Sequence, residues 1–546
     1  MDYQKLADLL FPDVTETRED IERRFPPRSL PAGANVTRIG PSPTGFVHLG
    51  NLYNAIIAER VAHQSGGVFY LRIEDTDNKR EVEGAVETVI NAMAYFDVHF
   101  DEGATSTGDN GAYGPYRQRQ RKEIYHVFAK WLVQNGKAYP CFLTEEELTA
   151  IREEQLANKE IVTGFFGKYA EVSRNLTLED ISARIAAGQP WVLRFRAEMN
   201  DKRFTITDAI RGKLDMPCNI MDFVLLKSDG IPTYHFAHVV DDHLMRSTHV
   251  VRGEEWLSTL SMHVELFDVF GWDKPIYCHT STLQKIDGGS KRKLSKRKDP
   301  ELALAFYQQE GICKEAIWEF LLTVLNSNFE EWRAANPDAS YMEFPFSLEK
   351  MSTSGALFDM EKLNNIAKDV IGRMDAETVL SHLKNWCSEY NREFLALIEQ
   401  YPDRTLKALG VGKQGAKPRK DFVNWKQTCE FLSFYFDETF KAQDDMPAEI
   451  SEEDRKAFFA KYLASYAHED DAEAWFAKVR QISDELGYAV KPKDYKKNPE
   501  NYKGSIVHVT NMLRTALTGM ANAPDIWEIS HVLGEELTRA RLGKWA

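Results

Sequence analysis

The sequence lacks any long apolar segment. No stretch of its 546 residues approaches the ~18 consecutive apolar residues that a membrane-spanning helix requires. Its first twenty residues carry several acids and lack the basic start, apolar core and small-residue cleavage site of a secretory signal. These absences predict a protein of the cytoplasm that does not contact a membrane.

The sequence also lacks paired cysteines. The six cysteines are scattered, with no C-x-x-C pair and no Cys/His spacing typical of zinc. In a reducing cytoplasm we expect them to be free, buried thiols. The chain shows no internal repeat and no low-complexity tract, and hydrophobic residues at 43% are ordinary for a globular protein. A prior of about 150 residues per domain suggests about three or four domains.

The charge balance is acidic. The formal net charge is −15, which by itself argues against nucleic-acid binding. A localised basic surface can nevertheless bind phosphates while the rest of a molecule stays acidic.

The first part of the chain has the pattern of a parallel sheet. Residues 1–35 look like an appendage with one short amphipathic helix and a proline-rich exit. Residues 35–39 then predict a strand, a Pro/Gly loop follows, and apolar spacing after it predicts a helix. Residues 68–73 predict a buried strand. Strand, loop, helix and strand in this order are typical of a nucleotide-binding α/β sheet.

The pattern then changes and returns. A helical stretch at 125–133 is followed by strand-rich segments at 191–204 and 223–227. Sheet-like elements resume at 233–240 and 249–252, which indicates an insertion that splits the nucleotide fold. Beyond residue 300 the pattern is helical. It includes a capping box at Ser451 and Asp454 and an amphipathic helix over residues 526–533.

The densest chemical signal is TRIGPSPTGFVHLGNLYNA, residues 37–55. Gly40, Gly45 and Gly50 make a loop of little side-chain bulk between a strand and a helix. Such a loop aims backbone N–H groups and the helix dipole at an anion, and His48 could donate to a phosphate. The alternative is a tight turn whose glycines serve packing alone.

A second signal is KIDGGSKRKLSKRKD, residues 285–299. It has seven basic residues against two acidic ones. A mobile lysine-rich loop suits a polyphosphate whose charge grows in a transition state. On composition alone, a solvated surface loop is an equal alternative.

Two further segments carry polar residues at strand ends. Residues 71–77 (LRIEDTD) end a strand in carboxylates that could hold an ammonium group, a ribose or a metal, or serve only as a helix cap and salt-bridged turn. Residues 222–256 contain several histidines next to Asp241 and Asp242, but no known metal-ligand spacing, so we predict no metal site. Arg252, at the end of a strand, could grip a carboxylate with a bidentate fork.

Together these segments resemble a class I aminoacyl-tRNA synthetase of the bacterial glutamyl type. HLGN at 48–51 is similar to the family's HIGH signature, and KLSKR at 293–297 to its KMSKS signature. The flanking text fits as well: PSPTG at 41–45, RIEDTD at 72–77, GPYRQ at 114–118, LLKSDGIPTYHFA, VVRGEEW, SGALFDMEKL at 354–363 and LRTALTG at 513–519. The glutaminyl relatives would show PEPNG and RFDDTN-like text instead.

The resemblance implies a fold. It is a Rossmann-type parallel α/β catalytic domain, split by an α+β insertion and followed by an all-α anticodon-binding region. The implied order is an N-terminal extension (1–35), the first catalytic half (36–118), an acceptor-binding insertion (119–232), the second catalytic half with the lysine loop (233–300), a helical stem-contact domain (301–375) and a helical anticodon-binding domain (376–546).

The resemblance also implies a reaction. Glutamate attacks the α-phosphate of ATP, giving glutamyl-adenylate and pyrophosphate, and the glutamyl group then passes to the 3′-terminal adenosine of tRNA-Glu. Mg²⁺ accompanies the ATP, and the family suggests a monomer. Whether tRNA-Gln is also charged stays open, since spacing does not locate the residues that read the anticodon.

Site residues follow from the matching motifs. The HIGH-type motif covers Pro41, Ser42, Pro43, Thr44, Gly45, Phe46, Val47, His48, Leu49, Gly50 and Asn51, and the KMSKS-type motif covers Lys293, Leu294, Ser295, Lys296 and Arg297. The implied catalytic residues are His48, Lys293 and Lys296. ATP would be held by Gly40, His48, Gly50, Asn51, Lys293, Ser295 and Lys296. Glutamate would be held by Arg38, Ser42, Glu74, Tyr234, His238 and Arg252.

The chain departs from the family pattern in three places. The fourth HIGH position is Asn51 instead of His. Cys141 is followed by Phe142 and Leu143 where many relatives carry a zinc-binding C-x-C, so we predict no zinc. Residues 1–35 precede the usual start, and the sequence assigns them no function.

Two basic segments are candidates for tRNA contact, with solvated loops as an even alternative. One contains Lys413, Lys417, Arg419 and Lys420, and the other is the lysine-rich run 491–497. Two other functions are kept as hypotheses. A catalytically inactive tRNA-binding scaffold is disfavoured by the intact His48, Lys293 and Lys296. An enzyme that glutamylates a modified tRNA base is disfavoured by the long C-terminal region.

Overall fold

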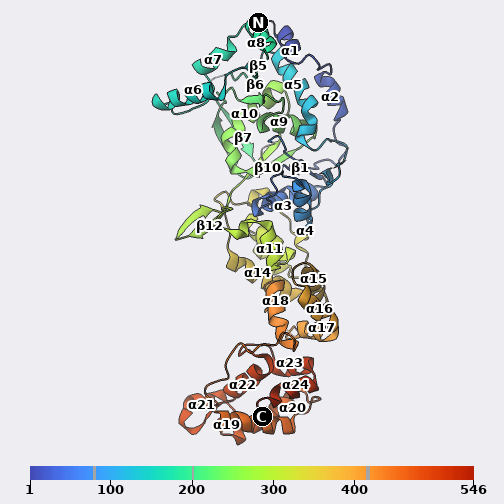
Figure 1. The fold of residues 1–546 in the computed structure, drawn as a ribbon, viewed down its shortest axis with the longest axis vertical. Helices are drawn as coiled ribbons and strands as arrows, with labels where there is room; N and C mark the ends of the chain where they lie inside the picture. The colour runs from blue at the N-terminus through green and yellow to red at the C-terminus, as the bar shows by residue number, and fades with distance from the viewer. Residues whose placement is uncertain (78–81, 199–201, 414–418) are drawn as a thin grey trace. The chain divides into compact units, whose positions relative to one another are not determined.

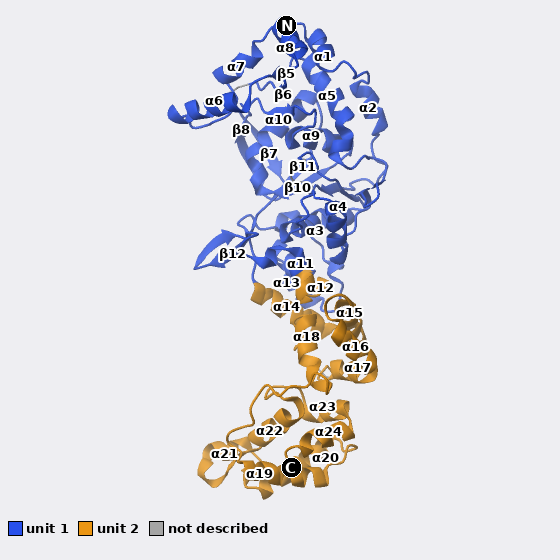
Figure 2. Ribbon diagram, in the orientation of Figure 1, with its two compact units in different colours: residues 1–306, 318–359 blue, residues 307–317, 360–546 orange. Residues whose placement is uncertain are grey.

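The chain folds into two compact units. The computed structural model describes residues 1–77, 82–198, 202–413 and 419–546. The first unit comprises residues 1–306 with 318–359, and the second comprises residues 307–317 with 360–546 (Figure 2). The predicted catalytic motifs all lie in the first unit.

The first unit contains the predicted parallel sheet. Strands β1 (Val36–Ile39) and β2 (Val68–Leu71) pair in parallel, with Val36 opposite Val68, and helix α3 (Leu49–His63) connects them. Strand β3 (Glu102–Ala104) extends the sheet in parallel, β4 (Asp109–Asn110) closes that edge antiparallel, and α4 (Ala85–Tyr95) precedes β3. All four β1 residues are buried, as expected for a parallel strand covered on both faces. The predicted strand–loop–helix–strand unit is confirmed.

The second half of the sheet comes from a distant part of the chain. Strand β10 (His249–Gly253) pairs in parallel with β11 (Ile276–Thr280). The Thr248 N–H donates to the Val36 carbonyl over 2.9 Å, so β10 lies next to β1. Helices α9 (Tyr234–Leu244) and α10 (Leu260–Phe270) pack against each other beside these strands (Figure 1). The prediction of a nucleotide fold split by an insertion is therefore confirmed.

The insertion is a mixed α+β segment. Its core is an antiparallel sheet of β5 (Ala138–Cys141), β6 (Val192–Phe195) and β9 (Val224–Leu226). A separate hairpin pairs β7 (Arg203–Asp208) with β8 (Gly212–Pro217). Its helices are α5 (Lys122–Gln134), α6 (Glu145–Ala157), α7 (Lys168–Arg174) and α8 (Leu178–Ala186). The prediction of strands at 191–204 and 223–227 holds, although the first segment contains parts of two strands.

The predicted sheet-like element at 233–240 is wrong, because these residues begin helix α9. Phe236, Val239 and Val240 are buried at helical spacing, but Ala237 and His238 between them are buried as well. Because most sides of this helix are buried, and polar residues such as His238 are buried with the apolar ones, the apolar residues do not mark a helical period.

Residues 1–35 are not a detached appendage. Helix α1 (Tyr3–Leu10) packs on α5, and α2 (Arg18–Arg24) packs on it as well. Glu22 accepts hydrogen bonds from His243 (2.7 Å) and Arg246 (3.0 Å) at the end of α9. Apolar burial and ion pairs together anchor the segment, since Leu6, Phe11 and Ile21 are buried beside these ionic contacts.

The lysine-rich loop belongs to a small sheet of the first unit. Strands β12 (Leu283–Asp287) and β13 (Ser290–Lys293) form an antiparallel hairpin, and β14 (Ala356–Leu357) joins β12 in parallel. Helix α13 (Phe329–Ala335) also lies in this unit, whereas α11 (Leu304–Glu310) and α12 (Lys314–Leu325) each have residues in both units.

The second unit is helical, as predicted. Its elements are α14 (Met360–Arg373), α15 (Ala376–Tyr390), α16 (Arg392–Gln400), α17 (Pro402–Gly410), α18 (Trp425–Leu432), α19 (Glu452–Ser465), α20 (Ala472–Glu485), α21 (Pro492–Lys497), α22 (Ile506–Thr518), α23 (Ile526–Leu533) and α24 (Glu535–Gly543), with a small pair of strands β15 (Tyr488–Ala489) and β16 (Gly504–Ser505). Ser451 caps α19, since its hydroxyl accepts from the Asp454 N–H over 3.1 Å.

All six cysteines are free, and five are buried, whereas Cys218 is partly exposed. Within the described ranges, no helix is both long enough and apolar enough to cross a bilayer.

We predict that the N-terminal segment contributes to stability through Ile21, which is fully buried. Ile21→Ala should lower the free energy of unfolding of the first unit by about 2–4 kcal/mol, since it leaves a cavity between α2 and its neighbours. Thermal unfolding measures the change, and the exposed Glu19→Ala is the control, with an expected change below ~0.5 kcal/mol. Equal melting temperatures for both variants would contradict the packing role.

Candidate active site

The Gly-rich loop leads from β1 into α3 with His48 as the helix cap. The His48 Nδ1 accepts from the Asn51 N–H (3.2 Å), and the Asn51 Oδ1 accepts from the His48 N–H (3.0 Å). This reciprocal capping box explains the asparagine at the fourth HIGH position, because its side chain stabilises the helix start. With Nδ1 as an acceptor, the proton of a neutral His48 lies on Nε2.

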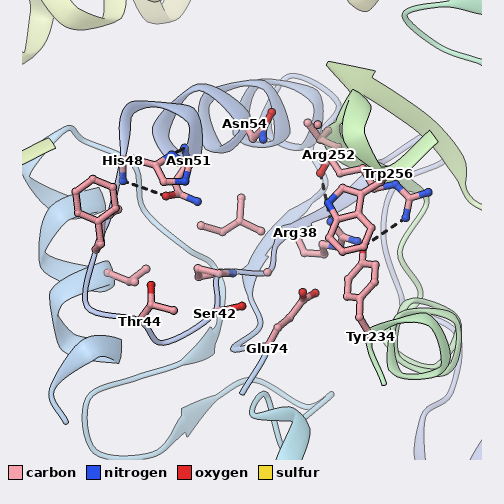
Figure 3. Close-up of a pocket in the computed structure, with 18 of the residues that line it drawn as sticks. Arg38, Ser42, Thr44, His48, Asn51, Asn54, Glu74, Tyr234, Arg252 and Trp256 are labelled. Atoms are coloured by element: carbon pink, nitrogen blue, oxygen red, sulfur yellow. Dashed lines mark hydrogen bonds between the residues drawn. The ribbon is translucent and has the colours of Figure 1, made fainter. Parts of the chain in front are cut away.

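A cavity of about 340 Å³ lies between this loop and strand β10 (Figure 3). Its size is within the range of small-ligand sites. The wall includes most residues of the predicted HIGH-type motif. It also includes five of the six predicted glutamate contacts, Arg38, Ser42, Glu74, Tyr234 and Arg252. In Figure 3, His48 and Asn51 lie on one side of the cavity, and Tyr234, Arg252 and Trp256 on the other. Residues from both sequence halves therefore form one site.

Gly40 makes room for Glu74. A Cβ atom at position 40 would lie 2.2 Å from the Glu74 Oε1, so only glycine permits this carboxylate to lie against the loop. The Glu74 Oε1 accepts from the Arg72 Nη2 over 3.0 Å. Burial raises the pKa of Glu74 above its ordinary value, and the charges of Arg72 and Arg38 act in the opposite direction.

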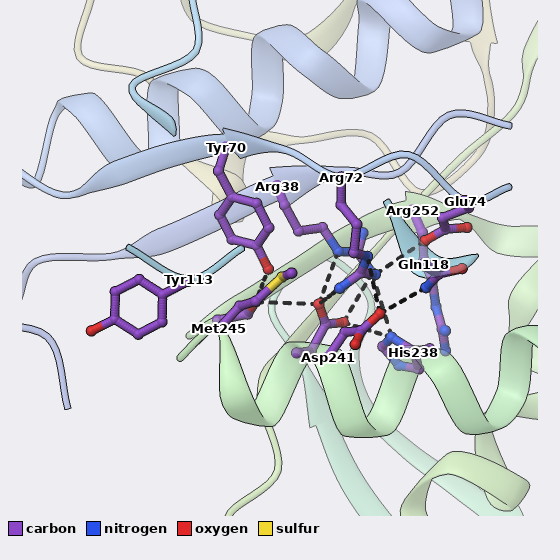
Figure 4. A network of polar contacts seen from close by, with 12 residues as sticks. Arg38, Tyr70, Arg72, Glu74, Tyr113, Gln118, His238, Asp241, Met245 and Arg252 are labelled. Carbon is purple, nitrogen blue, oxygen red and sulfur yellow. Dashed lines mark hydrogen bonds and ion pairs between the residues drawn. The ribbon is translucent and has the colours of Figure 1, made fainter. Parts of the chain in front are cut away.

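A buried ionic network lies beneath the cavity (Figure 4). Arg38 donates to the Asp242 carboxylate through Nε (3.3 Å) and Nη2 (3.1 Å), and Arg72 donates to the same carboxylate over 2.6 Å. Asp241 accepts from the Arg121 Nε over 2.7 Å. The neighbouring arginines hold the pKa of Asp242 well below its ordinary value despite its burial. The network fixes Arg38 from β1 against α9.

His238 does not line the cavity. It is fully buried behind Tyr234, with the two rings stacked at 5.6 Å. Its Nδ1 lies 2.6 Å from Asp242, and its Nε2 lies 3.2 Å from the Tyr277 hydroxyl. Burial lowers the pKa of His238 to about 3. The structure thus places this predicted glutamate contact in the supporting network instead of at the ligand.

The lysine-rich loop lies close to His48. The Lys296 Nζ is 4.0 Å from the centre of the Phe46 ring, and Phe46 lines the cavity. Arg292 forms a bidentate ion pair with Asp299 at 2.6 and 2.8 Å, which fixes the base of the loop. Lys293 and Lys296 are exposed and are not part of the cavity wall. Burial lowers the pKa of His48, and the positive charges of these two lysines lower it further.

The other polar candidates have structural partners. The Asp75 Oδ1 accepts from the backbone N–H of Arg119 over 2.8 Å, which fits the alternative of a structural role for this carboxylate. His235 contacts His263, and His243 stacks on Trp272 at 3.9 Å. In the described part of the chain, no three His, Cys, Asp or Glu side chains are placed to hold a metal ion.

Several wall residues lie outside the predicted site residues, and two of them, Asn54 and Trp256, make side-chain contacts within the site. Asn54 lies one turn beyond Asn51 on α3 and is not part of the predicted motif. It lines the cavity, and its Oδ1 accepts a hydrogen bond from the Thr280 hydroxyl over 2.9 Å. Trp256 packs on Tyr234 with ring centres 4.1 Å apart. Trp256 is the last residue of the VVRGEEW segment, and its closeness in sequence to Arg252 was the feature that could have identified it as a site residue.

The fold is that of a class I aminoacyl-tRNA synthetase. Residues 35–365 match the family model described as the catalytic domain of class I tRNA synthetases (E and Q). Residues 499–546 match a model described as an anticodon binding domain. The chain belongs to this family.

Within the class, the chain belongs to the glutamate–tRNA ligases. It is 54% identical to a glutamate–tRNA ligase of Acetivibrio thermocellus over 99% of both chains, and 46% identical to one of Clostridium perfringens over the full length of both. The crystal structure of glutamate–tRNA synthetase from Elizabethkingia anophelis superposes with a TM-score of 0.74 at 28% identity, covering 94% of this chain and 99% of that one.

The charge of the lysine loop should be measurable at His48. Because Lys293 and Lys296 lower its pKa, Lys293→Ala/Lys296→Ala should raise the His48 pKa toward its ordinary value. NMR titration of the imidazole measures this. Lys298→Ala, an exposed lysine of the same loop, should produce a smaller rise. An unchanged titration in the double variant would show that the loop is not close to His48 in solution.

Proposed function

We propose that this chain activates L-glutamate with ATP and transfers the glutamyl group to the 3′-terminal adenosine of tRNA-Glu. The observation that carries the proposal is one cavity with two chemically different sides. One side presents Arg252, Arg38 and Glu74, which suit a zwitterionic dicarboxylic amino acid. The other presents a helix N-terminus and His48 close to a lysine-rich loop, which suits a polyphosphate.

Glutamate would be held at both ends. Its side-chain carboxylate would receive hydrogen bonds from Arg252 and Arg38, with Tyr234 and Ser42 lining the same space. Its α-ammonium group would pair with Glu74, whose carboxylate lies at the carboxyl end of β2. The α-carboxylate would then be free to attack phosphorus. His238 would act indirectly, by holding Asp242 and Tyr234 in place.

ATP would be held by Gly40, Gly50, Asn51 and His48, with Ser295, Lys293 and Lys296 closing over the phosphates. The His48 Nε2–H is available as a donor, since Nδ1 caps the helix. As the bond between the α- and β-phosphates breaks, negative charge accumulates on pyrophosphate, and two ammonium groups would stabilise it. Mg²⁺ would enter as part of the MgATP substrate.

The remaining domains would bind tRNA. We assign residues 119–232 to the acceptor end, 301–375 to the stem and 376–546 to the anticodon, with residues 1–35 as an N-terminal extension joined to the catalytic halves 36–118 and 233–300. A monomer in the cytoplasm completes the proposal.

The two basic segments differ in their contacts. The Lys413 ammonium donates to the Ile371 and Met374 carbonyls, Arg419 pairs with Asp421, and Lys420 pairs with Asp369. These residues therefore have structural partners, and Lys417 lies outside the described residues. The lysines of α21 are exposed, and no ion pair of theirs occurs within the described ranges. They are the better candidates for phosphate contact.

Aminoacylation tests the proposal. Purified chain with ATP, Mg²⁺ and glutamate should charge tRNA-Glu, and tRNA-Gln assayed side by side shows whether that tRNA is also a substrate. Absence of charging and of pyrophosphate exchange with every tRNA would favour a binding scaffold.

Lys296→Ala should lower the rate of activation by about 10²-fold or more, since the lysine acts on charge that develops in the transition state. The Kd for tRNA should stay nearly unchanged. Single-turnover kinetics and tRNA binding measure the two quantities, and Lys298→Ala controls for net charge. An activation rate equal to the wild type would refute the role of Lys296.

Charge reversal on α21 should weaken tRNA binding. Lys496→Glu/Lys497→Glu is expected to raise the Kd for tRNA-Glu about tenfold or more at ~0.1 M salt and to flatten its salt dependence. Lys5→Glu/Arg23→Glu, a reversal of equal charge at two exposed residues of the N-terminal extension, is the control. Equal losses in the two double variants would mean that only net charge matters.

A further inference from the structure

Arg252 and Arg38 both line the cavity, but their surroundings differ. The inference drawn from this difference rests on the proposed function. The Arg252 side chain is 4% exposed, and it lines the cavity. Among the described residues, no carboxylate oxygen lies within 4.0 Å of its guanidinium nitrogens. A buried positive charge without a counter-ion is costly, so the site is completed energetically only when a negative ligand binds.

The partners of Arg252 are neutral acceptors. Its Nε donates to the His279 Nε2 over 3.0 Å, and its Nη1 contacts the His263 Nδ1 and the Tyr234 hydroxyl, each over 3.3 Å. Its Nη2 is buried, and within the described residues it has no hydrogen-bond partner. Three neutral groups therefore orient the guanidinium without compensating its positive charge. One donor nitrogen, Nη2, remains available to a ligand.

The two histidines are held in the tautomers that this arrangement requires. The His279 Nδ1–H donates to the Asp208 carboxylate over 2.7 Å, which leaves Nε2 as the acceptor toward Arg252. The His263 Nε2 lies 3.0 Å from the His235 Nδ1, so a proton on His263 Nε2 leaves Nδ1 free to accept. Burial lowers the pKa of His263 far below its ordinary value and that of His279 below it as well. Burial likewise lowers the pKa of His235 to about 4.

Arg38 has the opposite environment. It makes two hydrogen bonds to Asp242 and belongs to a network in which three arginines face three carboxylates. Its charge is compensated within the protein before any ligand binds. A ligand carboxylate therefore finds the uncompensated charge at Arg252. A carboxamide of the same shape brings no charge and, in one of its two orientations, turns N–H donors toward the donors of Arg252.

We propose that His263 and His279 are positioning residues that select glutamate over glutamine. They orient Arg252 through neutral acceptor nitrogens, whereas a carboxylate in the place of either histidine would cancel the positive charge of Arg252. A site of this kind rejects the neutral isostere strongly, since the buried charge then stays unpaired.

The test is a matched pair at position 263. His263→Asp places a carboxylate beside the Arg252 Nη1, whereas His263→Asn restores a neutral acceptor of the same shape as aspartate. His263→Asp should raise the Kd and KM for glutamate about 100-fold or more with a smaller effect on kcat, and should lower the glutamate-over-glutamine ratio of kcat/KM at least ~10-fold. His263→Asn should raise the KM for glutamate less than ~10-fold.

The measurements are calorimetric binding of glutamate and glutamine to the full chain, and aminoacylation with both amino acids. An unchanged KM for ATP and an unchanged melting temperature show that the variants fold. Wild-type discrimination in folded His263→Asp, or equal losses in the Asp and Asn variants, overturns the inference while the proposed function stands. If the wild type neither binds glutamate nor charges tRNA, the proposed function fails, and the inference fails with it.

A second measurement needs no variant. Imidazole ¹⁵N shifts of the wild-type protein should show neutral rings, with His263 unprotonated at Nδ1 and His279 unprotonated at Nε2, before and after glutamate is added. An imidazolium at either position overturns the inference.

Discussion

The compensated ionic network between β1, β2 and α9 is the constraint on which the site depends. Arg38 on β1 and Arg72, directly after β2, extend to the carboxylates of Asp241 and Asp242 on α9. All four side chains are essentially excluded from solvent. Breaking one member of such a group leaves an uncompensated buried charge, which typically costs about 3–5 kcal/mol. The network therefore couples the two sequence halves of the catalytic fold, and it sets the position of Tyr234 on the same helix.

The two sides of the cavity offer different chemical groups to a ligand. On the phosphate side, the chain uses backbone N–H groups at a helix start, and the side chain of Asn51 secures His48 there. On the amino-acid side, it uses guanidinium groups whose charge is compensated at Arg38 and left uncompensated at Arg252. The lysine-rich loop adds charge from outside the cavity wall, where it has room to approach a polyphosphate.

The sequence predicted more of the fold than of the contacts. The parallel unit, the split catalytic domain and the helical C-terminal region all carried clear periodicity or turn signals. The error at α9 arose because this helix buries polar residues together with apolar ones, so that polarity does not report which side faces solvent. The segment 1–35 was misjudged for another reason, since neither its buried apolar residues nor the ion pairs of Glu22 show in the sequence which surface they contact.

By itself, the sequence determined the family, the two loops that carry its motifs and the residue types available for phosphate and carboxylate recognition. These depend on local spacing, which a chain displays directly. Only the tertiary structure decided that His238 lies behind the cavity, that Trp256 and Asn54 line it, and that Arg38 has a carboxylate partner whereas Arg252 has neutral ones. Such differences depend on which distant side chains share a buried space, and in that space the charge of each neighbour decides what a residue can bind.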